Sequence, residues 1–286
     1  MPELPEVETM RRGLLPTVGR KITAIEDLRC PRKPIAIMPQ LGTIARRMVG
    51  TRISVVDRLG KRVVVVTSTG DRLVIEPRMT GLVLLADPPD PLYLRLKISL
   101  AGRNPRAFYF WDRRGLGTVR LYSEAEFAKA LGPPKLGPDA LAMTAQEYRE
   151  RLAKSKRAIK VALLDQKVTA GIGNLYASEL LHVAAIHPAK RCHELTRAEW
   201  SRLADAAIIV LEEAIAHEGS TLGDGTYRNA LNQAGGYQNL HRVYAKGGEP
   251  CMRCGMTIER IVQAQRSTFF CANCQPRRGK PRTVTR

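Results

Sequence analysis

The sequence of 286 residues is poor in acidic side chains and has no long hydrophobic segment. Asp and Glu number 27 against 46 Lys and Arg, which gives a formal net charge of +19. No apolar run reaches the roughly 18 residues that cross a membrane, so no transmembrane helix is predicted. The first residues are acidic and lack the apolar core of a signal peptide. We therefore expect a cytoplasmic protein.

The excess of basic residues indicates a polyanionic partner. The sequence pI is about 10.1, and a domain pI above ~9 is typical of proteins that bind nucleic acid. The basic residues are scattered over the whole length, which favours a folded nucleic-acid-binding protein over a globular domain with a basic arm. Ribosomal and membrane-surface proteins share this charge, so charge alone does not decide between these classes.

The chain has few cysteines, and their spacing indicates a metal site. Of the six, Cys30 and Cys192 stand alone. The other four form two CxxC pairs separated by sixteen residues, namely Cys251 with Cys254 and Cys271 with Cys274. This is the spacing of a four-thiolate zinc site, which has no open coordination position and is therefore structural. The alternative, four unligated thiols, fits such a specific spacing poorly. We expect one Zn²⁺.

Hydrophobic periodicity divides the chain into a strand-rich part and a helical part, with no internal repeats. A helix is predicted over residues 5–15, followed by a strand-like pattern from 20 to 122. Residues 132–139 have the composition of a linker. Capping-box pairs at Thr144 with Glu147 and Thr196 with Glu199 mark helix starts. Helices are expected near 145–153, 157–166, 175–185 and 197–216, and a long loop over 219–240.

The N-terminal peptide Pro2-Glu3-Leu-Pro-Glu6 carries groups suited to covalent chemistry. If Met1 is removed, Pro2 becomes a secondary amine that can attack an aldehyde-level carbon and form a charged iminium, an electron sink like a lysine Schiff base. The carboxylates of Glu3 and Glu6 suit proton transfer beside it. The alternative is an ordinary chain start with Pro5 in the first turn of a helix.

Two further motifs are candidate phosphate contacts. In Gly171-Ile-Gly-Asn174, before a predicted helix, Asn is a good N-cap, and helix N-termini attract phosphate. A simple turn between helices is an equally good interpretation of this peptide. Lys61, after Gly60, could hold a phosphate, although an exposed lysine is usually only solvated. The segment between the cysteine pairs, with Arg266, could also grip phosphate.

Together, these motifs and their order resemble one family. Pro2-Glu-Leu-Pro-Glu6, Gly171-Ile-Gly-Asn174-Leu-Tyr-Ala-Ser-Glu179 and Gln265-Arg266-Ser-Thr-Phe-Phe-Cys271 resemble the formamidopyrimidine-DNA glycosylase family, whose sister branch is endonuclease VIII. The resemblance runs from residue 2 to about residue 275. It implies a bifunctional DNA repair enzyme that excises oxidised purines from double-stranded DNA and cleaves the abasic site by β,δ-elimination.

The resemblance also implies an α+β multidomain fold, with DNA held between the domains. It implies a monomer in the bacterial cytoplasm, associated with the nucleoid and not with a membrane. The expected segments are a catalytic β-sandwich with an N-terminal helix at 2–131, a linker at 132–143, a helix–two-turn–helix domain with a lesion-capping loop at 144–240, a zinc ribbon at 245–275 and a basic tail at 276–286.

Residue roles follow from the resemblance position by position. Pro2 would attack C1′ of the damaged nucleotide, Glu3 would transfer protons and Glu6 would support them. The phosphate clamp would consist of Lys61, Asn174 and Arg266. The loop from about Ser220 to Gln238 would close over the flipped purine.

The chain departs from the family pattern at two places. In Glu76-Pro-Arg-Met-Thr-Gly81, Met79 remains as a wedge, but Glu76 stands where the family often has His, and we expect it to repel phosphate. In Asp112-Arg-Arg-Gly-Leu-Gly117, Arg114 would face the base opposite the lesion and Leu116 would replace an intercalating Phe. The sequence therefore does not determine how the protein scans DNA for lesions or which base it prefers opposite the lesion.

Two other functions fit the sequence. One is an endonuclease VIII-like glycosylase for oxidised pyrimidines, against which Met79 and the Gly- and Gln-rich loop argue. The other is a non-catalytic protein that binds damaged DNA. The combination of Pro2 and Glu3 argues against mere binding, because binding requires neither group.

Overall fold

The computed structural model describes residues 2–223 and 225–277, and these group into two compact units. The first unit contains residues 1–135 and 214–238, and the second contains residues 136–213 and 239–286. The loop predicted over 219–240 therefore groups mainly with the N-terminal unit, whereas the sequence placed it in a helical domain at 144–240. Within the predicted linker at 132–143, the side chains of Leu136, Ala140 and Met143 are buried. The basic tail lies largely outside the described residues.

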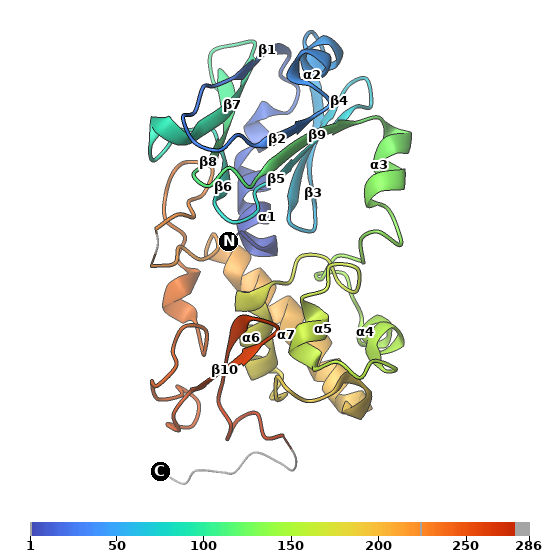
Figure 1. Cartoon of the computed structure of the whole chain (residues 1–286), viewed down its shortest axis with the longest axis vertical. Helices are drawn as coiled ribbons and strands as arrows, with labels where there is room; N and C mark the ends of the chain where they lie inside the picture. The colour runs from blue at the N-terminus through green and yellow to red at the C-terminus, as the bar shows by residue number, and fades with distance from the viewer. Residues whose placement is uncertain (1, 224, 278–286) are drawn as a thin grey trace. The chain divides into compact units, whose positions relative to one another are not determined.

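The first unit is a β-sandwich that is preceded in the chain by helix α1, at Leu4–Gly13 (Figure 1). One sheet has the order β1-β7-β8-β6 and the other has the order β2-β9-β5-β4-β3. The strands are β1 (Ile22–Asp27), β2 (Ala36–Met38), β3 (Ile53–Leu59), β4 (Arg62–Thr67), β5 (Arg72–Glu76), β6 (Gly81–Leu84), β7 (Leu94–Leu100), β8 (Ala107–Asp112) and β9 (Thr118–Tyr122). Two further helices are α2 (Leu41–Met48) and α3 (Glu124–Leu131), with 3₁₀ turns at Leu15–Thr17 and Pro91–Tyr93.

The core of this unit lies between the two sheets and includes one face of α1. Val7 and Met10 of α1 and the C-cap residue Leu14 are fully buried, and they pack with strand residues of both sheets. The helical spacing of these three residues predicted the helix. Helix α2 interrupts a region that the sequence assigned to strands. Ile44 and Met48, both buried and four residues apart, are the signal that could have revealed it.

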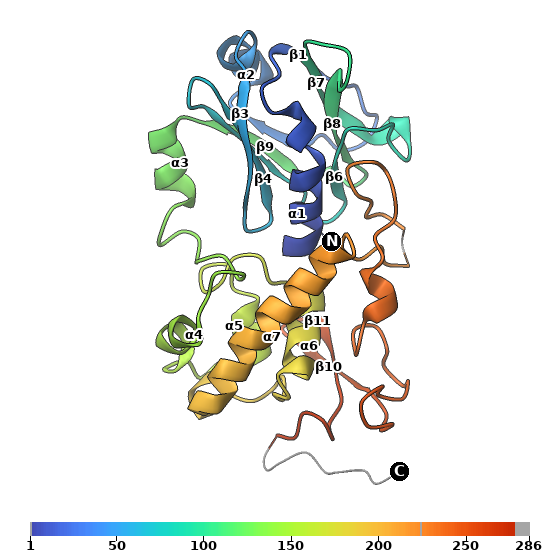
Figure 2. The same cartoon turned by 180° about the vertical axis from the view of Figure 1, so that it is seen from behind.

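The second unit consists of helices and a two-stranded hairpin (Figure 2). Its elements are α4 (Ala145–Leu152), α5 (Ile159–Leu163), α6 (Asn174–Val183), a 3₁₀ turn at Cys192–Glu194, most of α7 (Arg197–Ala216), β10 (Glu259–Gln263) and β11 (Arg266–Phe270). Both predicted capping boxes are present, at Thr144 with Glu147 and at Thr196 with Glu199. A final 3₁₀ turn, Tyr237–Leu240, ends the loop that follows α7.

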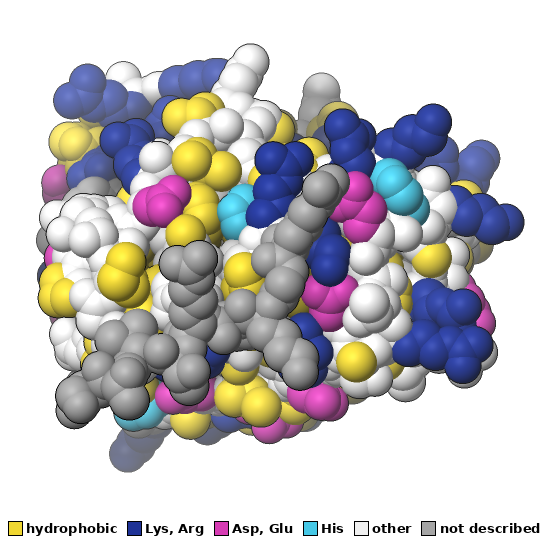
Figure 3. Space-filling view, turned by 90° about the horizontal axis from the view of Figure 1, so that it is seen from below, with side chains coloured by type: hydrophobic (Ala, Val, Ile, Leu, Met, Phe, Trp, Pro, Cys, Tyr) yellow, Lys and Arg dark blue, Asp and Glu magenta, His cyan; other side chains and the backbone are white. Residues whose placement is uncertain are grey.

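Basic side chains are spread over one face of the molecule (Figure 3). On the face in Figure 3, Lys and Arg side chains form several separate groups with Asp and Glu between them. Within the described ranges, no helix is long and apolar enough to cross a membrane.

Candidate active site and metal centre

Pro2 and Glu3 lie at the start of α1, where the backbone is held by a reciprocal cap. Glu3 is the N-cap residue, and its backbone N–H donates to Glu6 Oε2 at 2.9 Å, while the Glu3 side chain accepts from the backbone of Glu6. Pro2, Glu3 and Glu6 are all buried. The closely spaced proline and carboxylates of the sequence therefore form a compact group at one helix end.

Glu6 also holds the start of the predicted capping loop. The backbone N–H of Ser220 donates to Glu6 Oε1 at 2.9 Å. The Tyr227 hydroxyl donates to the backbone oxygen of Glu218 at 2.9 Å and to that of Glu6 at 3.4 Å. Desolvation, followed by the nearby Glu6 carboxylate, raises the pKa of Tyr227 well above its ordinary value, so the phenol stays protonated and can donate. Glu6 thus links the N-terminal peptide to a segment more than 200 residues later.

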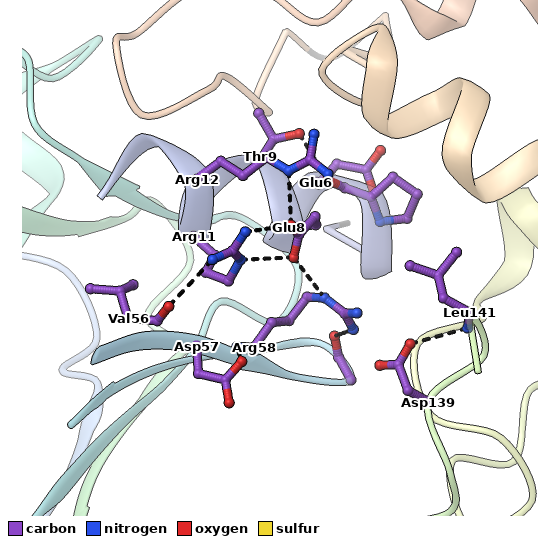
Figure 4. Close-up of polar contacts among 12 residues, drawn as sticks. Glu6, Glu8, Thr9, Arg11, Arg12, Val56, Asp57, Arg58, Asp139 and Leu141 are labelled. Atoms are coloured by element: carbon purple, nitrogen blue, oxygen red, sulfur yellow. Dashed lines mark hydrogen bonds and ion pairs between the residues drawn. The ribbon is translucent and has the colours of Figure 1, made fainter. Parts of the chain in front are cut away.

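Glu8 fixes the direction of α1 relative to β3 (Figure 4). Its carboxylate accepts hydrogen bonds from Arg11, Arg12 and Arg58 at 2.8–3.1 Å. Burial alone would raise the pKa of Glu8, but the hydrogen bonds from Arg11 and Arg12 and the charges of Arg11 and Arg58 lower it overall. Arg11 also donates to the Val56 backbone oxygen at 3.4 Å. Earlier residues of the helix therefore lie beside later residues of the strand.

This antiparallel arrangement directs the start of α1 toward the end of β3 at which the Gly60–Lys61 turn joins β3 to β4. Gly60 has a positive φ of 57° there, in the left-handed region that glycine adopts readily.

The strand register brings the remaining predicted residues of this unit to the same end of the sandwich. Arg62 begins β4, and the pairing of Val63 with Ile75 places it opposite Glu76, which ends β5. Glu76 in turn pairs with Thr118, the first residue of β9. The turn with Met79 follows β5, and the loop with Arg114 and Leu116 precedes β9. Met79 and Arg114 are exposed, and Leu116 is half-buried.

One buried carboxylate organises the loop that carries Arg114 and Leu116. Asp112 is fully buried and accepts a hydrogen bond from the Thr80 hydroxyl. It also accepts from the backbone N–H of Arg114 at 3.1 Å and from those of Leu116 and Gly117 at 2.8 Å. Because Thr80 follows Met79, Asp112 joins the proposed wedge to the proposed opposite-base loop. The sequence alone gave no sign of this role for Asp112.

In the second unit, a buried lysine brings Asn174 next to the hairpin. Lys160 is fully buried and donates to Asn174 Oδ1 at 2.6 Å, to the Thr268 hydroxyl at 2.7 Å and to the Ser267 backbone oxygen at 3.1 Å. Asn174 Nδ2 also donates to the Ser267 oxygen at 3.0 Å. Asn174 therefore contacts Ser267, the residue that follows Arg266 in the chain. The Arg266 side chain is exposed. The sequence did not reveal Lys160, since one lysine in a helical pattern carries no distinguishing signal.

The structure corrects the predicted cap of α6. Gly173 is the N-cap residue and Asn174 is the first helical residue. The Asn174 side chain is occupied by Lys160 and Ser267 and does not cap the helix.

Further along α6, Glu179 is fully buried and accepts from the backbone N–H groups of Arg242, Val243 and Tyr244 at 2.8–2.9 Å. Burial raises the pKa of Glu179 despite these bonds. Glu179 thus holds the segment that leads to the ribbon.

The hairpin that carries Arg266 has a tight turn. Ala264 and Gln265 both have positive φ, at 46° and 60°, and they join β10 to β11 between the paired Gln263 and Arg266. A two-residue turn with two positive φ angles matches the right-handed twist of a hairpin, but glycine or asparagine usually supplies it. Such strain is often found at functional sites.

The four predicted zinc ligands meet at one point. Their sulfur atoms lie within 4.8 Å of one another. Cys251 and Cys274 are 3.9 Å apart and Cys254 and Cys271 are 3.5 Å apart, measured between Sγ atoms. A tetrahedral ion with Zn–S bonds of ~2.3 Å needs sulfurs about 3.8 Å apart. The donor set fits Zn²⁺, and the four thiolates would hold it as a closed structural site with no position for substrate.

The fold and the site define a protein of two units. The first is a β-sandwich with a buried proline at position 2, and the second is a helical unit with a zinc ribbon. Three sequence models match the chain: the formamidopyrimidine-DNA glycosylase N-terminal domain over residues 1–119, the formamidopyrimidine-DNA glycosylase H2TH domain over 136–225, and a zinc finger found in FPG and IleRS over 248–277.

Curated relatives match over almost the whole chain. The formamidopyrimidine-DNA glycosylase of Herpetosiphon aurantiacus is 38% identical over 96% of this chain and 100% of its own length. That of Latilactobacillus sakei is 38% identical over 97% of this chain and 99% of its own length. The chain therefore belongs to the formamidopyrimidine-DNA glycosylase family, as predicted.

Solved structures of formamidopyrimidine-DNA glycosylases are similar to this chain over almost its whole length. The MutM (FPG) protein of Thermus thermophilus has a TM-score of 0.83 at 36% identity, covering 96% of this chain and 98% of that protein. An FPG variant of Lactococcus lactis, in complex with Fapy-dG-containing DNA, has a TM-score of 0.86 at 35% identity, covering 96% and 100%. The predicted α+β fold class, the DNA glycosylase class and the structural zinc site are confirmed.

Proposed function

We propose that this chain excises oxidised purines, such as 8-oxoguanine and formamidopyrimidines, from double-stranded DNA and then cleaves the abasic strand. The observation that carries the proposal is the group formed by Pro2, Glu3 and Glu6, with Glu6 bound to Ser220 of the loop. Catalytic groups and loop are thereby joined through one carboxylate. The similar Lactococcus lactis FPG variant, which was solved in complex with Fapy-dG-containing DNA, supports this class of substrate.

The proposed chemistry starts at the nitrogen of Pro2 after removal of Met1. The amine attacks C1′ of the damaged nucleotide and gives up its proton, while the bond to the base breaks and the base leaves in protonated form. The nitrogen lone pair then expels the ring oxygen O4′, and a cationic iminium forms. Glu3, the residue next to the amine, supplies a proton as the sugar ring opens and assists the later eliminations. Glu6 holds the Glu3 backbone and thus the position of both groups.

We further propose that phosphates are bound by Lys61 in the first unit and by Asn174 and Arg266 in the second. Lys61 lies in the turn between β3 and β4, whereas Asn174 and Arg266 belong to α6 and the hairpin. Met79 would fill the space of the flipped nucleotide, and Arg114 with Leu116 would meet the opposite strand. The enzyme would act as a monomer in the bacterial cytoplasm, at the nucleoid.

Trapping with borohydride tests the mechanism, because reduction converts an iminium into a stable covalent adduct. Duplexes with 8-oxoguanine, a formamidopyrimidine, an oxidised pyrimidine or an abasic site are incubated with the wild-type chain, Pro2→Gly and Glu3→Gln. We expect adducts with the purine lesions and the abasic site. We expect Glu3→Gln to bind DNA and lose most base excision.

Three outcomes would contradict the proposal. Full lyase activity of Pro2→Gly, or of protein that retains Met1, would remove Pro2 as the nucleophile. Adducts with the oxidised pyrimidine in preference to the purines would instead indicate endonuclease VIII-like specificity. No adduct with any duplex would favour a protein that only binds damaged DNA.

A further inference from the structure

Glu76, at the end of β5, lies between two arginines. Its Oε2 is 3.3 Å from Arg62 Nε and its Oε1 is 3.2 Å from Arg78 Nε. The Glu76 and Arg62 side chains are only 18% and 19% exposed, whereas Arg78 is 56% exposed. Each carboxylate oxygen therefore faces a different guanidinium, and the three side chains together carry a net charge of +1.

The backbone holds this cluster in place from two directions. Arg62 lies opposite Glu76 across the β4–β5 ladder, whose register is set by the pairing of Val63 with Ile75. Arg78 belongs to the turn after β5 and has a φ of 57°, in the left-handed region that residues with side chains rarely adopt. Such a conformation persists only where the surroundings support it, and the ion pair with Glu76 is one such support.

The cluster lies where the proposed function needs cationic groups. Arg62 follows Lys61 directly, and Arg78 precedes Met79, whose side chain is 39% exposed. A guanidinium has five N–H donors, and the ion pair through Nε leaves those of the two Nη atoms for another acceptor. Guanidinium and phosphate geometries match well, so an exposed arginine held in one orientation is a good phosphate ligand.

We propose that Glu76 is a positioning residue that holds the Arg78 guanidinium for contact with a DNA phosphate beside Met79, while Arg62 offsets its negative charge. This rests on the proposed DNA-binding function. It reverses the expectation from the sequence, in which Glu76 only repels phosphate. The two ideas predict opposite signs, because removal of a repelling charge strengthens DNA binding, whereas removal of a positioning group weakens it.

The test measures affinity for lesion-containing and undamaged duplexes over a salt series. The variants are Glu76→Met, Arg78→Ala and the double variant. Glu124→Met is the matched control, because Glu124 also pairs with an arginine, Arg72, at 2.7 Å but lies on α3. Thermal melting and zinc content establish that each variant is folded.

We expect Arg78→Ala to weaken binding roughly tenfold, as for one hydrogen-bonded charge, and to lower the log–log salt slope by about one. Glu76→Met should weaken binding in the same direction. It should have little further effect when Arg78 is already Ala, since coupled residues are non-additive. Glu124→Met should leave affinity unchanged or slightly higher.

Tighter or unchanged binding by Glu76→Met would overturn the positioning role. An unchanged salt slope in Arg78→Ala would remove the phosphate contact. If either variant gives such a result while the wild-type protein still forms a covalent adduct with damaged DNA in the presence of borohydride, the proposed function stands. Wild-type protein that neither binds duplex DNA nor traps would overturn both proposals.

Discussion

Replacement of Asp112 by alanine should disturb both stability and opposite-base preference. The carboxylate accepts from the Thr80 hydroxyl and from three backbone N–H groups of the loop that follows. The Gly117 N–H is buried, and an orphaned buried donor costs about 1–3 kcal/mol. The other bonds contribute about 1 kcal/mol each. We expect the free energy of unfolding to fall by about 4–6 kcal/mol and Tm to fall by roughly 10–20 °C.

The functional effect should be specific to the base opposite the lesion. Arg114 and Leu116 lose their anchors, so excision rates opposite cytosine and adenine should converge, whereas trapping on abasic-site DNA should persist. The matched control is Asp71→Ala, because Asp71 is a largely buried carboxylate of the same unit that accepts from Arg47 at 3.0 Å. That variant should lose stability without a change in preference. Asp112→Ala with wild-type preference would refute the reasoning.

Three further predictions concern the second unit. Chelation should release about one zinc per chain and abolish DNA binding while the β-sandwich stays folded; freshly purified protein without zinc would contradict this. Arg266→Ala should weaken binding to damaged and plain duplexes alike and lower the log–log salt slope by about one. The control Arg151→Ala, at an exposed site on α4, should change neither quantity. If Arg266→Ala has the salt slope of the wild-type protein, Arg266 is only solvated and does not contact phosphate. Burial, with the charge of Lys246, lowers the pKa of His241 from 6.5 to about 4. The folded protein favours the neutral ring, so the full stability is present above pH 6.5. As the pH falls from 6.5 towards 4, the free energy of unfolding decreases by up to about 3 kcal/mol. His241→Gln should show a flatter pH dependence of unfolding, and parallel curves would exclude the effect.

Much of the architecture could be predicted because its signals are local. The helix spacing of Val7, Met10 and Leu14 predicted α1, and the capping pairs placed the starts of α4 and α7. By contrast, α5 is shorter than predicted, at Ile159–Leu163, and α2 was missed because its apolar positions are few. Short elements depend on tertiary packing more than on their own periodicity.

The sequence by itself determined which chemical groups are present and which of them are close neighbours along the chain. Pro2 with Glu3, and the two CxxC pairs, belong to this kind, because a helix end or a single turn suffices to bring them together. The family resemblance rests on the same short-range motifs.

Only the tertiary structure decided how distant residues meet. It joins Glu6 to Ser220, Lys160 to Asn174 and Ser267, and Asp112 to Thr80. It also places Glu76 between Arg62 and Arg78 and thereby changes a repelling charge into a neutralised one. The reason is physical: strand register and burial set the environment of a charge, and that environment decides whether a carboxylate repels, anchors or positions its neighbours.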